Sequence, residues 1–297
     1  MHGAFAVMPL RLLGLLAAPL LAAVSCQSLP PAAAGQFTAS YGETYVQRDS
    51  GPLKADVYIP AGEGPFPGVL VVHGGAWRMG SRGQLSGVAQ RLAQQGFTAV
   101  AISYRLAPEH KFPAQIEDCK EAVRWMRRNA ERLRIDPDHM GGFGYSAGAH
   151  LVSLLATTTP DDGLEGVADA DALPSTRLQC VACGGAPCDL RPIPDHVDGL
   201  AFFLGGPPAA CRDKYRQASP AAFVSSDDPP MFFFHGEQDQ LVPLASPALM
   251  HRALRQAGVE SELYIVPKLG HMAASFDRGA IDRAIVFLAN HLQKQGE

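Results

Sequence analysis

Along the chain, continuous apolar runs alternate with segments in which apolar residues recur at helical spacing. Residues 68–72, 97–103 and 230–234 are apolar at almost every position, which is typical of strands that are buried on both faces of a sheet. Residues 82–95 and 113–133 carry apolar residues three or four positions apart, which predicts helices. This alternation predicts an α/β fold with a mostly parallel central sheet that helices flank on both faces.

The rest of the chain continues this alternation without an internal repeat or a convincing domain boundary. Residues 53–59 alternate apolar and polar positions and predict a half-buried strand. The further predicted strands are 140–143, 178–182 and 262–266, and the further predicted helices are 147–156, 201–204, 247–257 and 281–292. We therefore expect one catalytic domain over residues 46–297, with the proline-rich stretch 189–219 as a partial cover over its site.

The N-terminus has the pattern of an export signal. Arg11 precedes the apolar run 12–24, which is too short to span a bilayer comfortably. The sequence Ala-Val-Ser-Cys that ends at Cys26 is similar to a bacterial lipobox, in which the cysteine is lipidated. We expect a signal peptide over residues 1–25, a tether over 26–45, and an exported protein that is lipid-anchored or secreted. An uncleaved N-terminal anchor is the alternative.

The composition excludes several classes of protein. A hydrophobic content of 47% with 18% charged residues indicates a globular chain with a sizeable core. A mean hydropathy of 0.00 argues against a polytopic membrane protein. A net charge of −4 argues against nucleic acid as a partner, because nucleic-acid binders carry a basic surface. A small molecule is the expected partner, and the composition leaves the oligomeric state open.

The six cysteines do not predict a metal site. Cys119 lies on the apolar stripe of its helix and is expected to be a buried core thiol. Cys180 and Cys183 are three positions apart in a predicted strand and would face opposite sides of the sheet, so zinc is not expected. An oxidising compartment would allow one disulfide, and Cys188 with Cys211 is the candidate pair, although spacing does not fix the pairing.

A candidate nucleophile lies between a short apolar strand and a helix. The sequence Gly-Tyr-Ser-Ala-Gly at 144–148 fits the pattern G-x-S-x-G. In such a strand-to-helix turn the serine hydroxyl is exposed at the carboxyl edge of the sheet, and the flanking glycines avoid a clash. The dipole of the following helix favours negative charge nearby. Ser146 is therefore the candidate nucleophile, and a serine that only caps the helix is the alternative.

A serine nucleophile needs a base, and the base needs a carboxylate that orients it. Asp239 follows an apolar strand and lies on a loop at the same edge as Ser146, with Glu237 as its competitor. His271 follows the next predicted strand and lies at that edge as well. The chain order Ser146, Asp239, His271 is the one expected for such a turn in an α/β sheet. We assign these three residues to catalysis.

Small residues after the first apolar run predict an oxyanion hole. Gly74 and Gly75 allow backbone N–H groups to approach a substrate oxygen, and the N–H of Ala147 would complete the hole. His73 is expected to hold the shape of this loop rather than to take part in catalysis. Trp77 is expected either to line the acyl pocket or to pack beneath the loop.

These residues also carry a family resemblance. The shared pieces are His-Gly-Gly at 73–75, Tyr-Arg-Leu-Ala-Pro-Glu at 104–109, Phe-Pro-Ala at 112–114, Gly-Tyr-Ser-Ala-Gly at 144–148, and the loops of Asp239 and His271. On these pieces the chain resembles the α/β-hydrolase serine esterases, close to the bacterial carboxylesterases and the hormone-sensitive-lipase-like enzymes. The resemblance implies the α/β-hydrolase fold and a Ser-His-Asp triad.

Two positions depart from the hormone-sensitive-lipase-like pattern. Where that group has a third glycine and an acidic residue, this chain has Ala76 and Tyr145. In these details it resembles the carbohydrate acetyl or feruloyl esterases and the kynurenine-formamidase-like hydrolases. The long N-terminal helical cap of the lipase-like group is not expected, because few residues separate the tether from the strand at 53–59. We assign Trp77 and Tyr145 to substrate binding.

The expected reaction is hydrolysis of carboxylic esters of small or short acyl groups through an acyl-enzyme, without a metal or organic cofactor. Trp77 and Phe112 would narrow the acyl pocket. The same triad would serve an amidase, a formamidase or a peptidase, and these remain alternatives. A non-catalytic binding module or a purely structural surface lipoprotein would leave the presence of all three triad residues unexplained.

Overall fold

A computed structural model of the chain describes residues 35–167 and 172–293. Cys26 and the expected signal peptide lie outside the described residues. Within the described part, eight strands form one sheet in the order β1-β2-β4-β3-β5-β6-β7-β8. The strands are β1 (Phe37–Arg48), β2 (Gly51–Pro60), β3 (Phe66–Val72), β4 (Thr98–Ile102), β5 (Ile135–Tyr145), β6 (Cys180–Gly184), β7 (Met231–Gly236) and β8 (Ser261–Val266). β2 pairs antiparallel with β1 and β4, and the other neighbours are parallel, which confirms the mostly parallel sheet.

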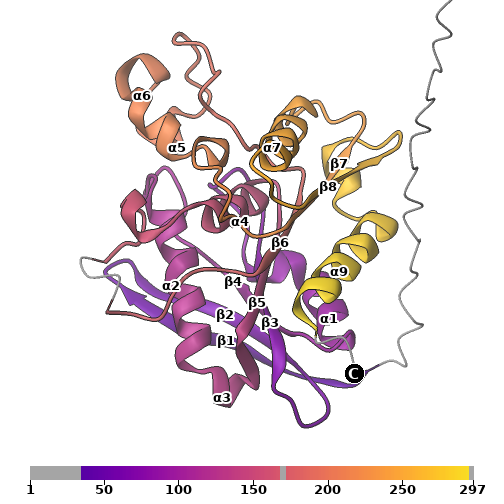
Figure 1. Cartoon of the computed structure of the whole chain (residues 1–297). Coiled ribbons are helices and arrows are strands. Elements are labelled where there is room, and N and C mark those ends of the chain that lie inside the picture. The colour runs from indigo at the N-terminus through magenta and orange to yellow at the C-terminus, as the bar shows by residue number, and fades with distance from the viewer. Residues whose placement is uncertain (1–34, 168–171, 294–297) are drawn as a thin grey trace, which may run out of the picture.

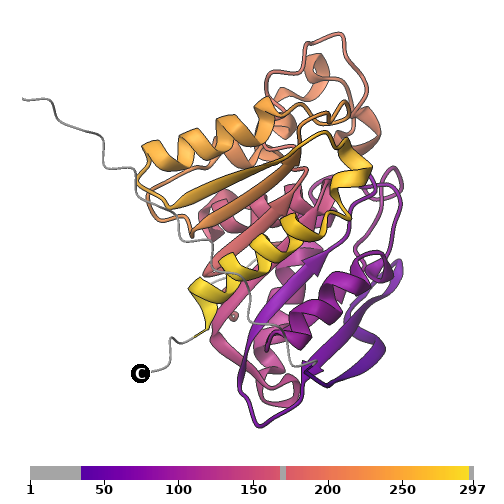
Figure 2. The same ribbon diagram turned by 90° about the vertical axis from the view of Figure 1, so that its right-hand side faces the viewer.

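Helices cover both faces of the sheet (Figures 1 and 2). The helices are α1 (Ser86–Gln94), α2 (Ala114–Arg128), α3 (Ala130–Leu133), α4 (Ala147–Thr157), α5 (Ala201–Leu204), α6 (Pro208–Gln217), α7 (Ala245–Gln256), α8 (His271–Ala274) and α9 (Arg278–Leu292). Three short 3₁₀ turns add η1 (Arg82–Leu85), η2 (Pro160–Asp162) and η3 (Pro220–Ala222). Apolar side chains of α2, α4 and α7 form the core on one face, and those of α1 and α9 form the core on the other. None of the helices in the described ranges is long and apolar enough to cross a membrane.

The continuous apolar runs arise because both faces of the central strands are covered. In β3, Leu70 and Val72 point into the core beneath α2 and α4, whereas Val69 and Val71 point into the core beneath α1 and α9. All four side chains are buried. A strand that is covered on both faces needs an apolar residue at every position. The parallel strands also run in the same direction, so their carboxyl ends lie at one edge of the sheet.

The sheet begins earlier than the sequence predicted. The tether was placed over residues 26–45, yet β1 starts at Phe37 and pairs antiparallel with β2. The boundary at residue 45 is therefore too late. β1 is an edge strand in which only Tyr45 is buried, so it lacks the apolar alternation that identified β2.

The structure confirms that Cys180 and Cys183 of β6 face opposite sides of the sheet, but it does not contain the candidate disulfide between Cys188 and Cys211. Cys180 lies in the core beneath α1 and α9, and Cys183 lies in the core on the opposite face. Cys188 and Cys211 are free, so the candidate disulfide is wrong. Cys188 is buried, with its N–H bonded to the Ser246 hydroxyl, whereas the Cys211 thiol faces carbonyl oxygens of its own helix turn.

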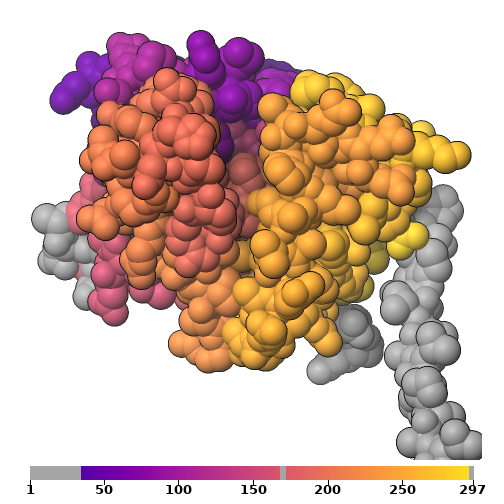
Figure 3. Space-filling model, turned by 90° about the horizontal axis from the view of Figure 1, so that it is seen from above, coloured from indigo at the N-terminus to yellow at the C-terminus, as the bar shows by residue number. Residues whose placement is uncertain are grey.

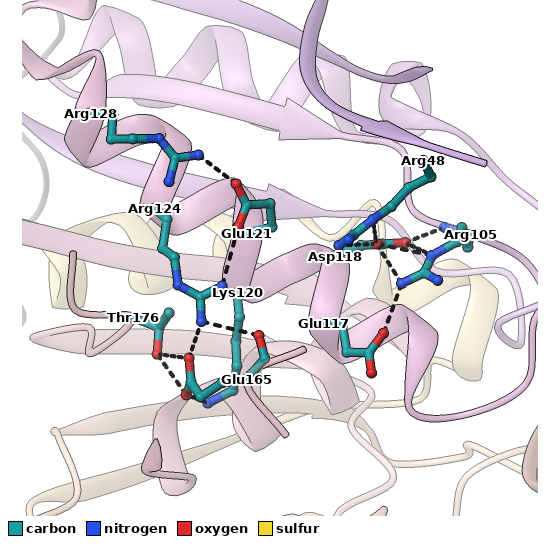
Figure 4. A network of polar contacts seen from close by, with 10 residues as sticks. All are labelled: Arg48, Arg105, Glu117, Asp118, Lys120, Glu121, Arg124, Arg128, Glu165 and Thr176. Atoms are coloured by element: carbon teal, nitrogen blue, oxygen red, sulfur yellow. Dashed lines mark hydrogen bonds and ion pairs between the residues drawn. The ribbon is translucent and has the colours of Figure 1, made fainter. Parts of the chain in front are cut away.

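Two ionic clusters fasten neighbouring segments to α2 (Figure 4). Asp118 is fully buried and binds both Arg48 of β1, at 3.0 Å, and Arg105 of the loop after β4, whose backbone N–H donates at 2.9 Å. Lys120 and Arg124 both bind Glu165, which lies in the segment between α4 and β6. Removing one partner of a buried pair costs on the order of 3–5 kcal/mol, so these clusters hold β1 and that segment against α2.

Residues 189–219, here called the cap segment, lie at the carboxyl edge of the parallel strands and contain α5 and α6 (Figure 1). Seen from above, a groove separates the orange cap segment from the yellow-orange residues of the C-terminal part (Figure 3). The helix predicted at 201–204 is confirmed as α5, whereas α6 was not predicted. The cap segment and the loops after β7 and β8 thus enclose the edge where the candidate residues were placed.

Candidate active site

The turn between β5 and α4 holds Ser146 in a strained conformation. Its φ is 55° and its ψ is −121°, a conformation that L-residues rarely adopt and that costs on the order of 1–3 kcal/mol. Its N–H donates to the carbonyl of Gly184 at 2.7 Å. A Cβ on Gly148 would lie 2.0 Å from the Val72 oxygen, and one on Gly144 would lie 2.4 Å from the Gly148 oxygen. Only glycine fits at these two positions.

The structure brings the three residues assigned to catalysis together. Nε2 of His271 lies 2.8 Å from Oγ of Ser146, and its Nδ1 lies 2.6 Å from Oδ2 of Asp239. Ser146 follows β5, Asp239 follows β7, and His271 follows β8 as the first residue of α8. Glu237, the competitor of Asp239, instead accepts the backbone N–H of Lys268 at 2.8 Å. The arrangement can transfer a proton from the serine hydroxyl to an imidazole that a carboxylate orients.

Asp239 is buried and fully bonded. Its Oδ1 accepts the backbone N–H groups of Leu241 and Val242, each at 2.9 Å. A second histidine, His235 on β7, places Nε2 at 3.2 Å from Oδ2 and at 2.9 Å from the Val242 oxygen. Burial lowers the pKa of His235, which keeps the ring neutral with Nε2 as the donor. The sequence reasoning missed this contact, although the spacing of four residues to Asp239 was a signal.

Tyr145 contacts His271 directly. Its hydroxyl donates to the backbone carbonyl of His271, and the two ring centroids are 5.4 Å apart. Burial raises the pKa of the Tyr145 hydroxyl well above its usual range. Tyr145 is only 5% exposed, so the contact that the structure shows for it is support of the base, and its assignment to substrate binding stays a prediction.

Residues 73–80, here called the oxyanion loop, lie against the nucleophile. A Cβ on Gly74 would lie 2.9 Å from the Tyr145 oxygen and 3.3 Å from Cβ of Ser146. Burial lowers the pKa of His73 to about 4, so its ring is neutral, and Nδ1 donates to the Gly74 carbonyl at 2.7 Å. In a trans peptide the carbonyl of one residue and the N–H of the next point in opposite directions, so the N–H of Gly75 points away from the His73 ring. His73 therefore holds the shape of the loop, as the sequence predicted.

Gly74 and Ala147, two of the residues assigned to the oxyanion hole, lie beside the nucleophile. Gly74 is pressed against the serine turn, and Ala147 is the first residue of α4, where a helix leaves its N–H groups without an internal partner. The three residues assigned to the oxyanion hole thus come from the oxyanion loop and the helix start. Donors at these places are suited to a developing negative charge on a substrate oxygen.

Trp77 packs beneath the oxyanion loop. One face of its ring stacks on Phe203 of α5, with centroids 4.3 Å apart and an interplanar angle of 6°. The indole N–H donates to Nδ1 of His150 at 3.1 Å, and Trp77 is 5% exposed. The packing alternative therefore describes Trp77 better than the assignment to substrate binding. In the described ranges, no group of three or more His, Cys, Asp or Glu residues is arranged to hold a metal ion.

The chain matches a known protein family and several curated esterases. The model of the BD-FAE family matches residues 55–254. Esterase LipQ of Mycobacterium tuberculosis is 33% identical over 230 residues, which is 73% of this chain and 52% of that protein. The chain spans about half the length of the first curated relatives that it matches.

Solved structures share the fold over almost the whole described chain. A truncated carbohydrate esterase from gut microbiota has a TM-score of 0.78 at 23% identity, covering 90% of this chain and 100% of that one; this likeness shows the fold alone. Thermogutta terrifontis esterase 2, a thermophilic esterase, has a TM-score of 0.72 at 25% identity, covering 90% and 97%. It has also been solved with butyrate or propionate bound and phosphonylated by sarin. The predicted α/β-hydrolase fold is thereby confirmed.

Proposed function

The chain belongs to the BD-FAE family, and from this membership and the site geometry we propose that it is a serine hydrolase that cleaves carboxylic esters. The observation that carries the proposal is the continuous contact from Ser146 through His271 to Asp239, at 2.8 and 2.6 Å. The esterase relatives and the phosphonylated esterase 2 structure support the same chemistry.

The geometry assigns a role to each group in two half-reactions. Oγ of Ser146 attacks the ester carbonyl while Nε2 of His271 takes its proton, and Asp239 stabilises the imidazolium. N–H groups of Gly74, Gly75 and Ala147 hold the oxyanion, and each such donor contributes roughly 3–4 kcal/mol to the transition state. His271 then protonates the leaving alcohol. Water, deprotonated by His271, hydrolyses the acyl-enzyme and restores the serine.

Replacement of the nucleophile tests this proposal. We expect Ser146→Ala to abolish hydrolysis of p-nitrophenyl acetate, because no other group supplies the acyl acceptor. A fluorophosphonate should label Ser146 and no other residue of the parent protein, as peptide mass spectrometry will show. The exposed Ser226 provides the control, since Ser226→Ala should leave the rate unchanged. Full activity of Ser146→Ala, or labelling elsewhere, would refute the assignment.

For the acyl group we propose short chains. Trp77 stacks on Phe203, and Phe112 packs edge-on against Phe203 with centroids 5.7 Å apart, so aromatic rings fill the space beneath the oxyanion loop, which supports a small acyl pocket. Esterase 2, solved with propionate and with butyrate, is a relative with short acyl ligands. A panel of acetyl, butyryl, octanoyl and feruloyl esters with a formamide tests this. The highest kcat/KM should fall on acetyl or butyryl, and a preference for the formamide would support the amidase alternative instead.

For localisation we propose export and lipid anchoring through Cys26. The support is the sequence alone: Arg11, the apolar run 12–24 and the lipobox-like residues before the cysteine. Cys26→Ser should release the protein from the membrane fraction of the native host, with activity retained in the soluble fraction. Membrane retention of this variant would contradict the proposal.

A further inference from the structure

His150 lies between the nucleophile turn, the oxyanion loop and the cap segment, and it has no role in the two half-reactions. It lies in the first turn of α4, where its backbone N–H donates to the carbonyl of Ser146 at 2.9 Å. Its side chain is fully buried. On one side the ring meets Trp77, and on the other it meets the backbone of Ala218.

The contacts of the ring fix its tautomer. The indole N–H of Trp77 can only donate, so Nδ1 of His150, at 3.1 Å, must accept. Nε2 then carries the proton and donates to the carbonyl of Ala218 at 2.6 Å. Both ring nitrogens are satisfied only in this neutral form. Burial lowers the pKa of His150 to about 4, which keeps the ring neutral near pH 7.

Trp77 is the point where this histidine acts on the oxyanion loop. Ala76 and Trp77 have φ values of 50° and 58°, two consecutive left-handed conformations in residues that are not glycine. Such conformations persist only where surrounding contacts hold them in place. Three contacts hold Trp77: its ring stacks on Phe203, its indole N–H donates to His150, and its carbonyl accepts the N–H of Ala107 at 2.8 Å.

We propose, on the basis of the proposed function, that His150 is a positioning residue that clamps Trp77 and thereby fixes the Gly74 and Gly75 donors of the oxyanion hole. The His150 ring that contacts Trp77 also donates to the carbonyl of Ala218, a residue of the cap segment. The cap segment therefore helps to set the geometry of the transition-state donors, besides covering the site.

Two variants separate the two bonds of the ring. His150→Asn places an amide oxygen where Nδ1 lies, so it keeps an acceptor for the indole and should retain kcat within about threefold. His150→Gln places its amide near Nε2, so it keeps a donor for Ala218 but offers no acceptor to Trp77. Complete loss of one oxyanion donor lowers kcat by about 10²–10³. In His150→Gln the donors are displaced and not lost, so we expect kcat to fall by about 10- to 100-fold. KM should change by less than about twofold, because the lost interaction is made only in the transition state.

Two further measurements and a control variant distinguish positioning from general loss of structure. A trifluoromethyl ketone forms a tetrahedral adduct whose oxygen occupies the oxyanion hole, so its Ki should rise by the same factor as kcat/KM falls. The chain has two tryptophans, so ¹⁵N-indole spectra should show a shifted Trp77 signal in His150→Gln and an unshifted Trp125 signal. His251→Asn, on α7, is the matched control and should leave both readouts unchanged.

The outcomes separate this inference from the proposed function. If the parent hydrolyses esters and Ser146→Ala does not, but His150→Gln keeps the parental kcat and Ki, the clamp is wrong and the esterase assignment stands. Equal loss in His150→Asn and His150→Gln would also overturn the clamp. If the parent cleaves no ester, the proposed function fails, and the indole spectra still report whether His150 holds Trp77.

Discussion

Asp239 shows how much of the active site is decided by one side chain. Its two oxygens accept three hydrogen bonds, from the backbone N–H groups of Leu241 and Val242 and from Nδ1 of His271, and Nε2 of His235 lies 3.2 Å from the carboxylate. A carboxylate bonded in this way has one orientation, and it therefore fixes the tautomer in which His271 presents Nε2 to the serine. The nearby Glu237 is exposed and accepts the backbone N–H of Lys268, and it does not contact His271.

This difference predicts unequal effects of two similar substitutions. Asp239→Asn should lower kcat by about 10⁴, because the amide favours the wrong tautomer of His271. Glu237→Gln keeps an acceptor for the N–H of Lys268 and should stay within about twofold of the parent. Steady-state kinetics on p-nitrophenyl acetate measures both. Comparable losses in the two variants would mean that the carboxylate has been misassigned.

At the scale of elements, the β5–α4 turn depends on close contact between α4 and β3. Gly148 approaches the backbone of Val72 so closely that a methyl group has no room. Gly87 on α1 is the opposite case, since a Cβ there would meet nothing within 4 Å and its backbone is helical. The two positions therefore respond in opposite directions to the same added methyl group.

Gly148→Ala should destabilise the fold by about 3 kcal/mol or prevent folding, because the clash is with backbone that cannot move away. Gly87→Ala should raise the free energy of unfolding by about 0.5–1 kcal/mol, because alanine has less conformational freedom in the unfolded chain. Urea denaturation followed by circular dichroism gives both values. A stable, fully active Gly148→Ala variant would contradict the tight contact described for this turn.

The elements that were predictable are those with a local signal. β3, β7 and α4 combine continuous apolar runs with glycine-rich turns, and the triad candidates follow from their position after such strands. β1 was missed because its pairing with β2, and not its own apolar pattern, makes it a strand. The contacts of His150 and Tyr145 were not predictable, since their partners Ala218 and His271 are distant in sequence.

For the whole molecule, buried titratable groups set the response to acid. Burial lowers the pKa values of His73 and His150 to about 4, whereas an unfolded histidine has a pKa of about 6.5. Between these values the unfolded chain binds more protons, so stability falls as the pH is lowered. Asp228 acts in the opposite direction, because burial raises its pKa to about 6 and the folded state takes up its proton first.

His73 and His150 against Asp228 predict a net loss on the order of 3 kcal/mol between about pH 6.5 and pH 4. His235, whose pKa burial also lowers, acts in the same direction as the other two histidines. The urea midpoint should therefore be lower at pH 4.5 than at pH 7.5. His150→Asn removes one of these histidines and should make the dependence on pH shallower. A midpoint that rises on acidification would show that the buried carboxyl group dominates instead.

The spread of the triad along the chain has a consequence for when the protein becomes active. His271 lies 125 positions from Ser146 and 32 from Asp239, and it meets both only after β7 and β8 have joined the sheet. A chain that is folded only as far as β6 carries the nucleophile without its base. The proposed hydrolytic activity therefore requires β7 and β8 to be in place, and the appearance of turnover reports that the sheet is complete as far as β8.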